Sequence, residues 1–181
     1  SVAREAQIVD ELDGLPLYIK LEALRHNKKG CVFGAALEED VYPSSGCACL
    51  AESPDEIGKG LRLAAQAVGA DDFGLLAVSS ARVLRHLPPE ADGLPISRYT
   101  MRYPARAVAE EILGLEPDCL IGVQALLALS RATAAGDVQT SFVVTVAGDC
   151  VDKPRNVRVA AGTPVSALLA HCELNRQDCT V

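Results

Sequence analysis

The sequence has no cluster of basic residues, no long apolar run and no N-terminal leader pattern. It carries 17 Lys and Arg against 24 Asp and Glu, which gives a formal net charge of −7. Neutralising phosphates takes clustered Lys and Arg, so this composition argues against nucleic-acid binding. No stretch approaches the ~20 apolar residues of a membrane helix, so we expect no direct membrane insertion. A signal-peptide pattern is also missing.

The composition that remains is that of a folded protein. Hydrophobic residues make up 49% of the 181 positions and charged residues 23%. Such a chain can bury a substantial core and is not typical of a disordered one. Its length suits one large domain, or one of medium size followed by a small one.

The cysteines do not form a recognisable framework. Their number is odd, whereas a disulfide-rich secreted chain favours an even count. Cys47 and Cys49 are too close for the usual zinc or redox spacing, and no iron–sulfur run is present. Several lie in apolar segments, where Cys acts as a small hydrophobe. We therefore expect a reducing, cytoplasmic environment and no metal site. The seven are Cys31, Cys47, Cys49, Cys119, Cys150, Cys172 and Cys179.

Short apolar segments alternate with helix-like segments through the first three quarters of the chain. "CVFGAAL", "FGLLAVS" and "CLIGV" are apolar on both faces, which predicts central strands of a sheet covered by helices on each side. "LPISRYTM" predicts a further strand. Ser53-Pro54 predicts a helix start and Gly69 its end, while "ARAVAEEILG" and "QALLALSRATAAG" predict two more helices. Together they predict an α/β domain with a mostly parallel sheet over residues 1–137.

The pattern changes after residue 137. Residues 142–171 predict strand, turn, strand, turn and helix, with Thr163 as the helix N-cap and Pro164 at its first position. We therefore divide the chain into an α/β domain, residues 1–137, and a small ββα element, residues 138–181.

The run "VVTVAGDCVDKPRNVRVAAGTPVSALL" resembles the soluble-ligand-binding β-grasp (SLBB) domain. It is similar to the copy that follows the flavin domain in RnfC, a component of the Rnf electron transport complex. The FMN- and NADH-binding subunit of respiratory complex I has the same arrangement. "SPDEIGKGLRLAAQAVGAD", "RYPARAVAEEILG" and "LEPDCLIGVQALLAL" are similar to further segments of that family, so the resemblance covers nearly the whole chain.

The resemblance implies FMN and NADH as cofactors and five residues as their binding positions. "VDELDGLP" stands where the family has its glycine-rich flavin loop, and "AALEEDV" where it has an acidic loop. The positions that match are Gly14, Lys20, Glu38, Asp40 and Gln124. No catalytic residue is assigned.

The departures from the family bear on whether a flavin binds. The loop replaces most of its glycines and places Asp10, Glu11 and Asp13 where a phosphate would lie, with Lys20 as the nearby cation. Ala125 stands where the family has an Asn after Gln124. We therefore expect weak or lost FMN and NADH binding.

Two functions stay open from the sequence. One is NADH- and flavin-linked electron transfer as an RnfC-like protein. The other is a non-catalytic role on the same scaffold, as a small-ligand-binding or docking protein. No iron–sulfur motif is present, so any cluster is expected on a partner or on a part beyond this chain.

Each implied site residue also has a plain structural interpretation. Glu38 and Asp40 fit a solvated acidic loop after a strand. Lys20 fits a surface lysine whose stem covers apolar neighbours. His26, His86 and His171 have no carboxylate or Cys at a ligand-like spacing, so we interpret all three as structural.

The end of the chain predicts an open sheet edge. Only seven residues, "NRQDCTV", follow the last helical segment, and they supply one short strand at most. An open edge pairs with other strands. We expect it to be covered by a second copy, which makes a homodimer, or by a segment beyond this chain. Alternatively "QDCTV" closes the sheet itself.

The partners that the family resemblance implies are a redox protein or the other components of a membrane complex, to which the chain would be peripheral.

Overall fold

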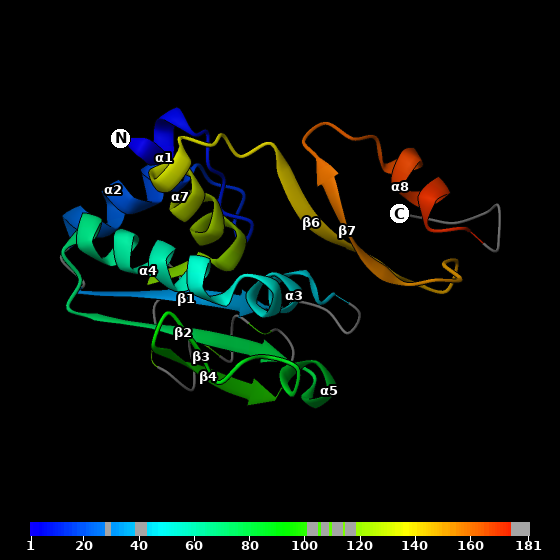
Figure 1. Cartoon of the computed structure of the whole chain (residues 1–181), viewed down its shortest axis with the longest axis horizontal. Helices are drawn as coiled ribbons and strands as arrows, with labels where there is room; N and C mark the ends of the chain where they lie inside the picture. Colours follow the sequence, from blue (N-terminus) through cyan, green and yellow to red (C-terminus); the bar gives the residue numbers. More distant parts are fainter. Residues whose placement is uncertain are drawn as a thin grey trace.

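The computed structural model describes residues 1–27, 30–38, 43–100, 105, 109, 114 and 119–174. An α/β unit with a five-stranded sheet is followed by a two-stranded hairpin that packs one short helix (Figure 1). The helices are α1 (Val2–Glu5), α2 (Leu17–Asn27), α3 (Ser45–Glu52), α4 (Pro54–Val68), α5 (Ala81–Leu84), α7 (Val123–Ala135) and α8 (Val165–His171). The strands are β1 (Cys31–Leu37), β2 (Asp72–Ser79), β3 (Glu90–Ala91), β4 (Leu94–Thr100), β5 (Leu120–Gly122), β6 (Ser141–Val146) and β7 (Arg155–Ala160).

The large sheet has the order β3-β4-β2-β1-β5 and is parallel except for β3. This confirms the predicted mostly parallel α/β fold and the central position of the segments "CVFGAAL" (β1) and "FGLLAVS" (β2). The prediction that "CLIGV" forms a central strand is wrong. It forms β5, which is only three residues long and lies at the end of the described sheet. Its side chains are buried nonetheless. A strand buried in this way needs the same apolar residues as a central strand, and the sequence pattern therefore does not distinguish the two.

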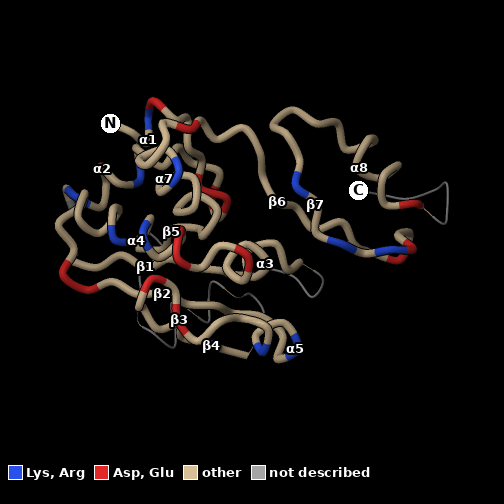
Figure 2. Tube along the Cα trace, in the orientation of Figure 1, with Lys and Arg blue, Asp and Glu red and all other residues tan. Residues whose placement is uncertain are grey.

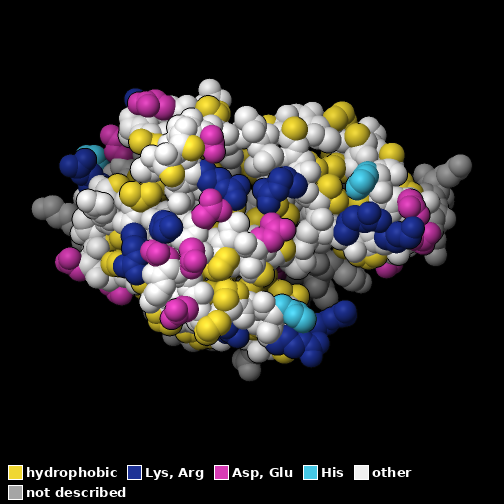
Figure 3. Space-filling view, in the orientation of Figure 1, with side chains coloured by type: hydrophobic (Ala, Val, Ile, Leu, Met, Phe, Trp, Pro, Cys, Tyr) yellow, Lys and Arg dark blue, Asp and Glu magenta, His cyan; other side chains and the backbone are white. Residues whose placement is uncertain are grey.

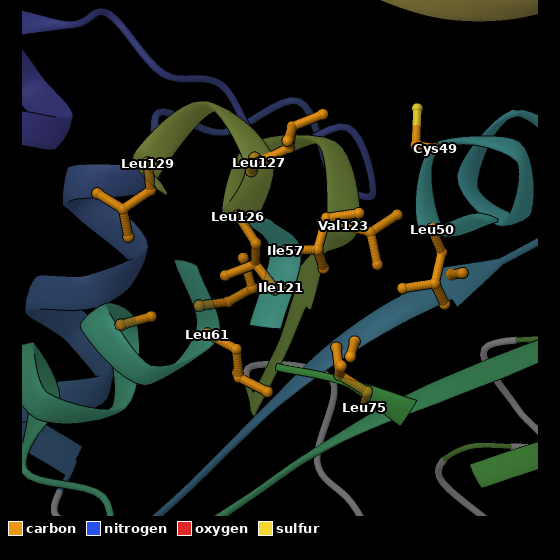
Figure 4. Close-up of a cluster of buried hydrophobic side chains, with 14 of the residues drawn as sticks. Cys49, Leu50, Ile57, Leu61, Leu75, Ile121, Val123, Leu126, Leu127 and Leu129 are labelled. Atoms are coloured by element: carbon orange, nitrogen blue, oxygen red, sulfur yellow. The ribbon is translucent and has the colours of Figure 1, made fainter. Parts of the chain in front are cut away.

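Side chains of β1 and β2 alternate between two apolar clusters, one on each face of the sheet. Val32, Ala36 and Leu75 belong to the larger cluster under α4 and α7, while Ala35 and Leu76 belong to a smaller one on the opposite face. Figure 4 shows the larger cluster, in which residues of both helices converge on the sheet. Its labelled members are Cys49, Leu50, Ile57, Leu61, Leu75, Ile121, Val123, Leu126, Leu127 and Leu129.

The helix boundaries confirm most of the sequence signals. Helix α4 begins at Pro54 after Ser53 and ends at Gly69, whose φ of 71° lies in the left-handed region that closes helices. Helix α8 departs from the prediction because Pro164, not Thr163, is its N-cap. The Thr163 hydroxyl instead donates to the carbonyl oxygen of Ala160. The segment "ARAVAEEILG" lies almost wholly outside the described residues.

The hairpin β6–β7 forms its own small sheet, with α8 packed on it. Val146, Val151 and Cys172 make up its buried cluster, with Leu168 and Leu169 against them. Figure 2 shows basic positions along β7 and the turn before it. On the face in Figure 3, acidic and basic side chains are interspersed.

Among the residues that the structure describes, five cysteines carry reduced thiols, and four of these are buried. Cys150 is disulfide-bonded, whereas the odd number of cysteines gives no indication of a disulfide. In the part of the chain that the structure describes, no group of His, Cys, Asp or Glu is arranged to hold a metal ion. No described helix has both the length and the apolar character needed to cross a membrane.

Candidate functional site

The loop of residues 9–16 lies at the carboxyl end of β5, where open α/β sheets place their ligands. A carboxylate oxygen of Asp10 accepts a hydrogen bond from the backbone N–H of Gly122, at 3.0 Å, which fixes the loop to that strand end. The resemblance places the implied flavin loop in these residues, and the fold brings them to the position where such a ligand would be expected.

The loop closes on itself through backbone hydrogen bonds. The N–H of Asp10 donates to the carbonyl of Leu15 at 2.9 Å, and the N–H of Gly14 donates to the carbonyl of Asp10 at 2.8 Å. Gly14 has φ +71°, a conformation that side chains rarely adopt, and no atom lies within 4 Å of the position its Cβ would take. Gly14 is therefore required by the backbone conformation of the turn itself.

Lys20 is buried between two carboxylates of this loop. Its Nζ lies 2.6 Å from an oxygen of Asp10 and 2.6 Å from an oxygen of Asp13. Lys20 is 6% exposed and Asp10 0%, so the interpretation of Lys20 as a surface lysine is wrong. An isolated buried charge is costly, and the opposite charges here compensate one another. The charge of Lys20 is therefore neutralised by two carboxylates of this loop.

Glu11 places its carboxylate at the N-terminus of α7. One oxygen accepts from the N–H of Gln124 at 2.6 Å, and the other accepts from the N–H of Ala125 at 3.0 Å. Helix N-termini bind anions through such N–H groups, which have no partner within the helix. A Cβ on Gly122 would overlap the Glu11 carboxyl group, so glycine is needed at that position for the acid to reach the helix.

Burial raises the pKa of Glu11 to about 7, and the charge of Asp10 adds to the rise. The backbone N–H groups of Gln124 and Ala125 oppose this by stabilising the charged form. The Glu11 carboxyl group therefore titrates near neutral pH, whereas an exposed glutamate is already ionised there.

Gln124 uses its side chain to hold the hairpin. Its amide nitrogen donates to the carbonyl of Val143 at 2.9 Å, and its amide oxygen accepts from the N–H of Val143 at 2.8 Å. In an antiparallel ladder each residue directs its backbone polar groups to one side, so Val143 presents its pair away from β7. The Gln124 side chain thus forms with this edge of β6 the two hydrogen bonds that a neighbouring strand would form.

Glu38 follows β1 directly and is buried, so its interpretation as part of a solvated loop is wrong. Its carboxylate accepts from the N–H of Cys47 at 3.0 Å, in the first turn of α3. Burial raises the pKa of Glu38, and burial together with the Glu38 charge raises the pKa of the Cys47 thiol. Asp40 lies outside the described residues.

These contacts decide how a flavin phosphate fits this chain. The N–H groups of Gly122, Gln124 and Ala125 already bind carboxylates, and Lys20 is neutralised by two more. A phosphate would have to displace these acids, so the residues present do not fit that group in this arrangement. The sequence predicts only that these acids repel a phosphate, whereas in the structure Glu11 binds the N-terminus of α7 and Asp10 binds the N–H of Gly122. The available signal is Gly122, a small residue between an apolar strand and a helix start.

The hairpin and α8 can be compared with known families. Residues 143–172 match the SLBB domain family. This confirms the β-grasp resemblance. The chain is also 51% identical over 47 residues to the C component of the ion-translocating oxidoreductase complex from two Vibrio cholerae O1 strains, Classical Ogawa 395 and El Tor Inaba N16961. That match covers 26% of this chain and 6% of each relative, so the chain spans a small part of these proteins.

The whole fold resembles a chain of the NAD+-reducing [NiFe]-hydrogenase. In the H2-reduced state the TM-score is 0.68 at 17% identity, and in the air-oxidized state it is 0.60 at 14% identity. Each comparison covers 96% of this chain and 38% of the hydrogenase chain. At this identity the likeness is one of fold, and it agrees with the α/β architecture with a mostly parallel sheet expected from the sequence.

Proposed function

We propose that this chain is an RnfC-like component of an NADH- and flavin-linked electron transport complex whose own FMN and NADH site is closed. Its role there is to dock redox partners or other components, peripheral to a membrane complex. The SLBB match and the name of the Vibrio relatives support the lineage. Because the chain covers a small part of those relatives, their activity is carried over here only as a proposal.

One observation is the main support for the proposal that the FMN and NADH site is closed. The carboxylate of Glu11 bonds to two N–H groups at the N-terminus of α7, the place at which a helix would hold a phosphate. Asp10 takes the neighbouring N–H of Gly122 and, with Asp13, the charge of Lys20. A second anion meets like charge and finds these donors occupied.

FMN titration tests this proposal. The wild-type chain should not bind FMN with sub-micromolar affinity, followed by quenching of FMN fluorescence and by calorimetry. The double variant Asp10→Gly, Glu11→Gly releases the three N–H groups and removes one of the two carboxylates that pair with Lys20, leaving Asp13. It should bind FMN about tenfold or more tightly than the wild type, equivalent to ~1.4 kcal/mol. Riboflavin lacks the phosphate and should gain nothing.

Glu22→Gly is the matched control, since it removes an exposed acid from α2. Stoichiometric FMN on the purified wild-type chain would contradict the closed site. An equal gain for riboflavin and FMN would show that the loop acids are not what excludes the phosphate.

A further inference from the structure

Two thiols face one another at the amino ends of adjacent parallel strands. Cys31 is the first residue of β1, and Cys119 directly precedes β5. Phe33 pairs with Leu120 in the ladder between these strands, which brings the two cysteines alongside each other. Their sulfur atoms are 3.0 Å apart, and both cysteines are reduced.

The distance between the two sulfur atoms is not much longer than that of a disulfide bond. A disulfide holds its sulfur atoms about 2 Å apart, so forming one here requires a movement of about 1 Å. The two thiols differ in access, because Cys31 is half-buried and Cys119 is 1% exposed. One thiol can therefore meet a reagent, and the other is within reach of its neighbour but not of solvent.

The pair is separate from the candidate site described above. Asp10 and Glu11 bind at the carboxyl end of β5 and at the start of α7, whereas Cys119 lies before the amino end of that strand. Cys47, Cys49 and Cys172, the other reduced thiols among the described residues, are all buried.

We propose that Cys31 and Cys119 form a reversible dithiol–disulfide pair that responds to low-molecular-weight disulfides. The Cys31 thiolate attacks one sulfur of the reagent disulfide, and the first reagent thiolate leaves. The Cys119 thiol then loses its proton and attacks the Cys31 sulfur, and the second reagent thiolate leaves. The protein loses two electrons and two protons, and the reagent disulfide becomes two thiols.

The bond would join β5 covalently to β1. Strand β5 has three residues and lies at the end of the described sheet, and α7 follows it without a break. Oxidation should therefore fix the base of α7, which carries the Glu11 and Gln124 contacts. Reduction by an excess of small thiol reverses the reaction.

Glutathione disulfide is the probe, applied to the folded full chain under native conditions. Maleimide labelling counts the thiols that remain, and peptide mapping without reductant locates the bonds. The wild type should lose two thiols, retain no glutathione and yield a peptide linked through Cys31 and Cys119. Cys119→Ser should retain one glutathione on Cys31, and Cys31→Ser should react much more slowly than the wild type. Cys172→Ser is the matched control and should behave as the wild type.

Glutathione that stays attached to Cys31 in the wild type overturns the proposal, as does a linked peptide that joins other cysteines. The wild-type peptide map decides the matter even if a variant fails to fold. Because its readout is a bond between two thiols, the experiment is independent of FMN binding and of the closed site.

Discussion

Glu11 carries a carboxylate that is more easily protonated in the folded chain than in the unfolded one. Its pKa is raised from 4.5 to about 7 by burial, with a contribution from Asp10. Between these values the folded state holds a proton that the unfolded state has released. The contribution of this group to stability is therefore full below about pH 4.5 and is lost as the pH rises to about 7, by about 3 kcal/mol.

Glu11→Gln should remove this pH dependence. Near pH 5 the folded-state carboxyl group is protonated, and its hydroxyl oxygen can still accept a hydrogen bond, whereas the amide nitrogen of Gln cannot. The variant therefore loses a hydrogen bond to α7 and should be less stable than the wild type at this pH. As the pH rises to 8 the variant should gain relative to the wild type by up to about 3 kcal/mol, since it has no charge to bury. Urea unfolding at several pH values measures the difference, and Glu22→Gln on α2 is the control. A difference that does not change with pH would contradict the buried charge.

Gly122→Ala should displace Glu11 without straining the backbone. The glycine has φ −63° and ψ 144°, which alanine adopts freely, but its Cβ would overlap the Glu11 carboxyl group. Loss of the two helix contacts should cost about 1–3 kcal/mol. In a Glu11→Ala background the same change should cost much less, because the clash is gone. Urea unfolding of the four proteins gives the coupling energy, and additive effects would contradict the contact.

At the scale of elements, the sequence is sufficient to predict a helix or strand where one face or both faces of the segment are apolar. Strands β1, β2 and β4 and helices α4 and α7 follow from apolar spacing and from Pro54 and Gly69. The position of β5 could not be predicted in this way. Burial on both faces is common to central strands and to edge strands covered by other elements, and strand order depends on which segments pair.

The hairpin depends on Gln124 for its inner edge. Gln124→Met keeps the side-chain volume but leaves the N–H and carbonyl of Val143 without their partner. The amide of Val143 should then exchange with solvent about tenfold faster or more, a local change of ~1.4 kcal/mol. Hydrogen exchange by NMR measures this, with Thr133→Val as the control, since that hydroxyl bonds to Leu129 within α7. Unchanged protection of Val143 would contradict the bridging role.

At the scale of the whole molecule, the match of residues 143–172 to the SLBB domain family is visible in the sequence, and the contacts of the candidate site are not. The β-grasp run is local, so its pattern survives in "VVTVAG" and "GTPVSALL". The site is assembled from residues more than 100 positions apart, such as Glu11 and Gln124. Whether Glu11 repels a phosphate or occupies its place depends on where α7 begins in space, and no spacing in the sequence contains that information.

The outer edge of β7 is the remaining open edge of the described hairpin. Alternation along the ladder directs the backbone groups of Asn156 and Arg158 and the N–H of Ala160 away from β6, while the Ala160 carbonyl accepts from Thr163. The edge of β6 is held instead by Gln124 and by the bond from the Ser44 N–H to the Thr145 hydroxyl. An open edge of this kind is a template for another strand.

We therefore expect the chain to form a homodimer by pairing β7 with its copy. Light scattering after size-exclusion chromatography should show a mass that rises with concentration. Ala160→Pro removes one outward N–H and should lower that mass at a given concentration, because proline cannot donate to a ladder. Ala161→Pro is the matched control for dimer contacts, since the Ala161 N–H bonds to Thr140 within the chain, and it should cost stability instead. A constant monomer mass, with the amides of Asn156, Arg158 and Ala160 protected from exchange, would mean that the chain covers this edge itself.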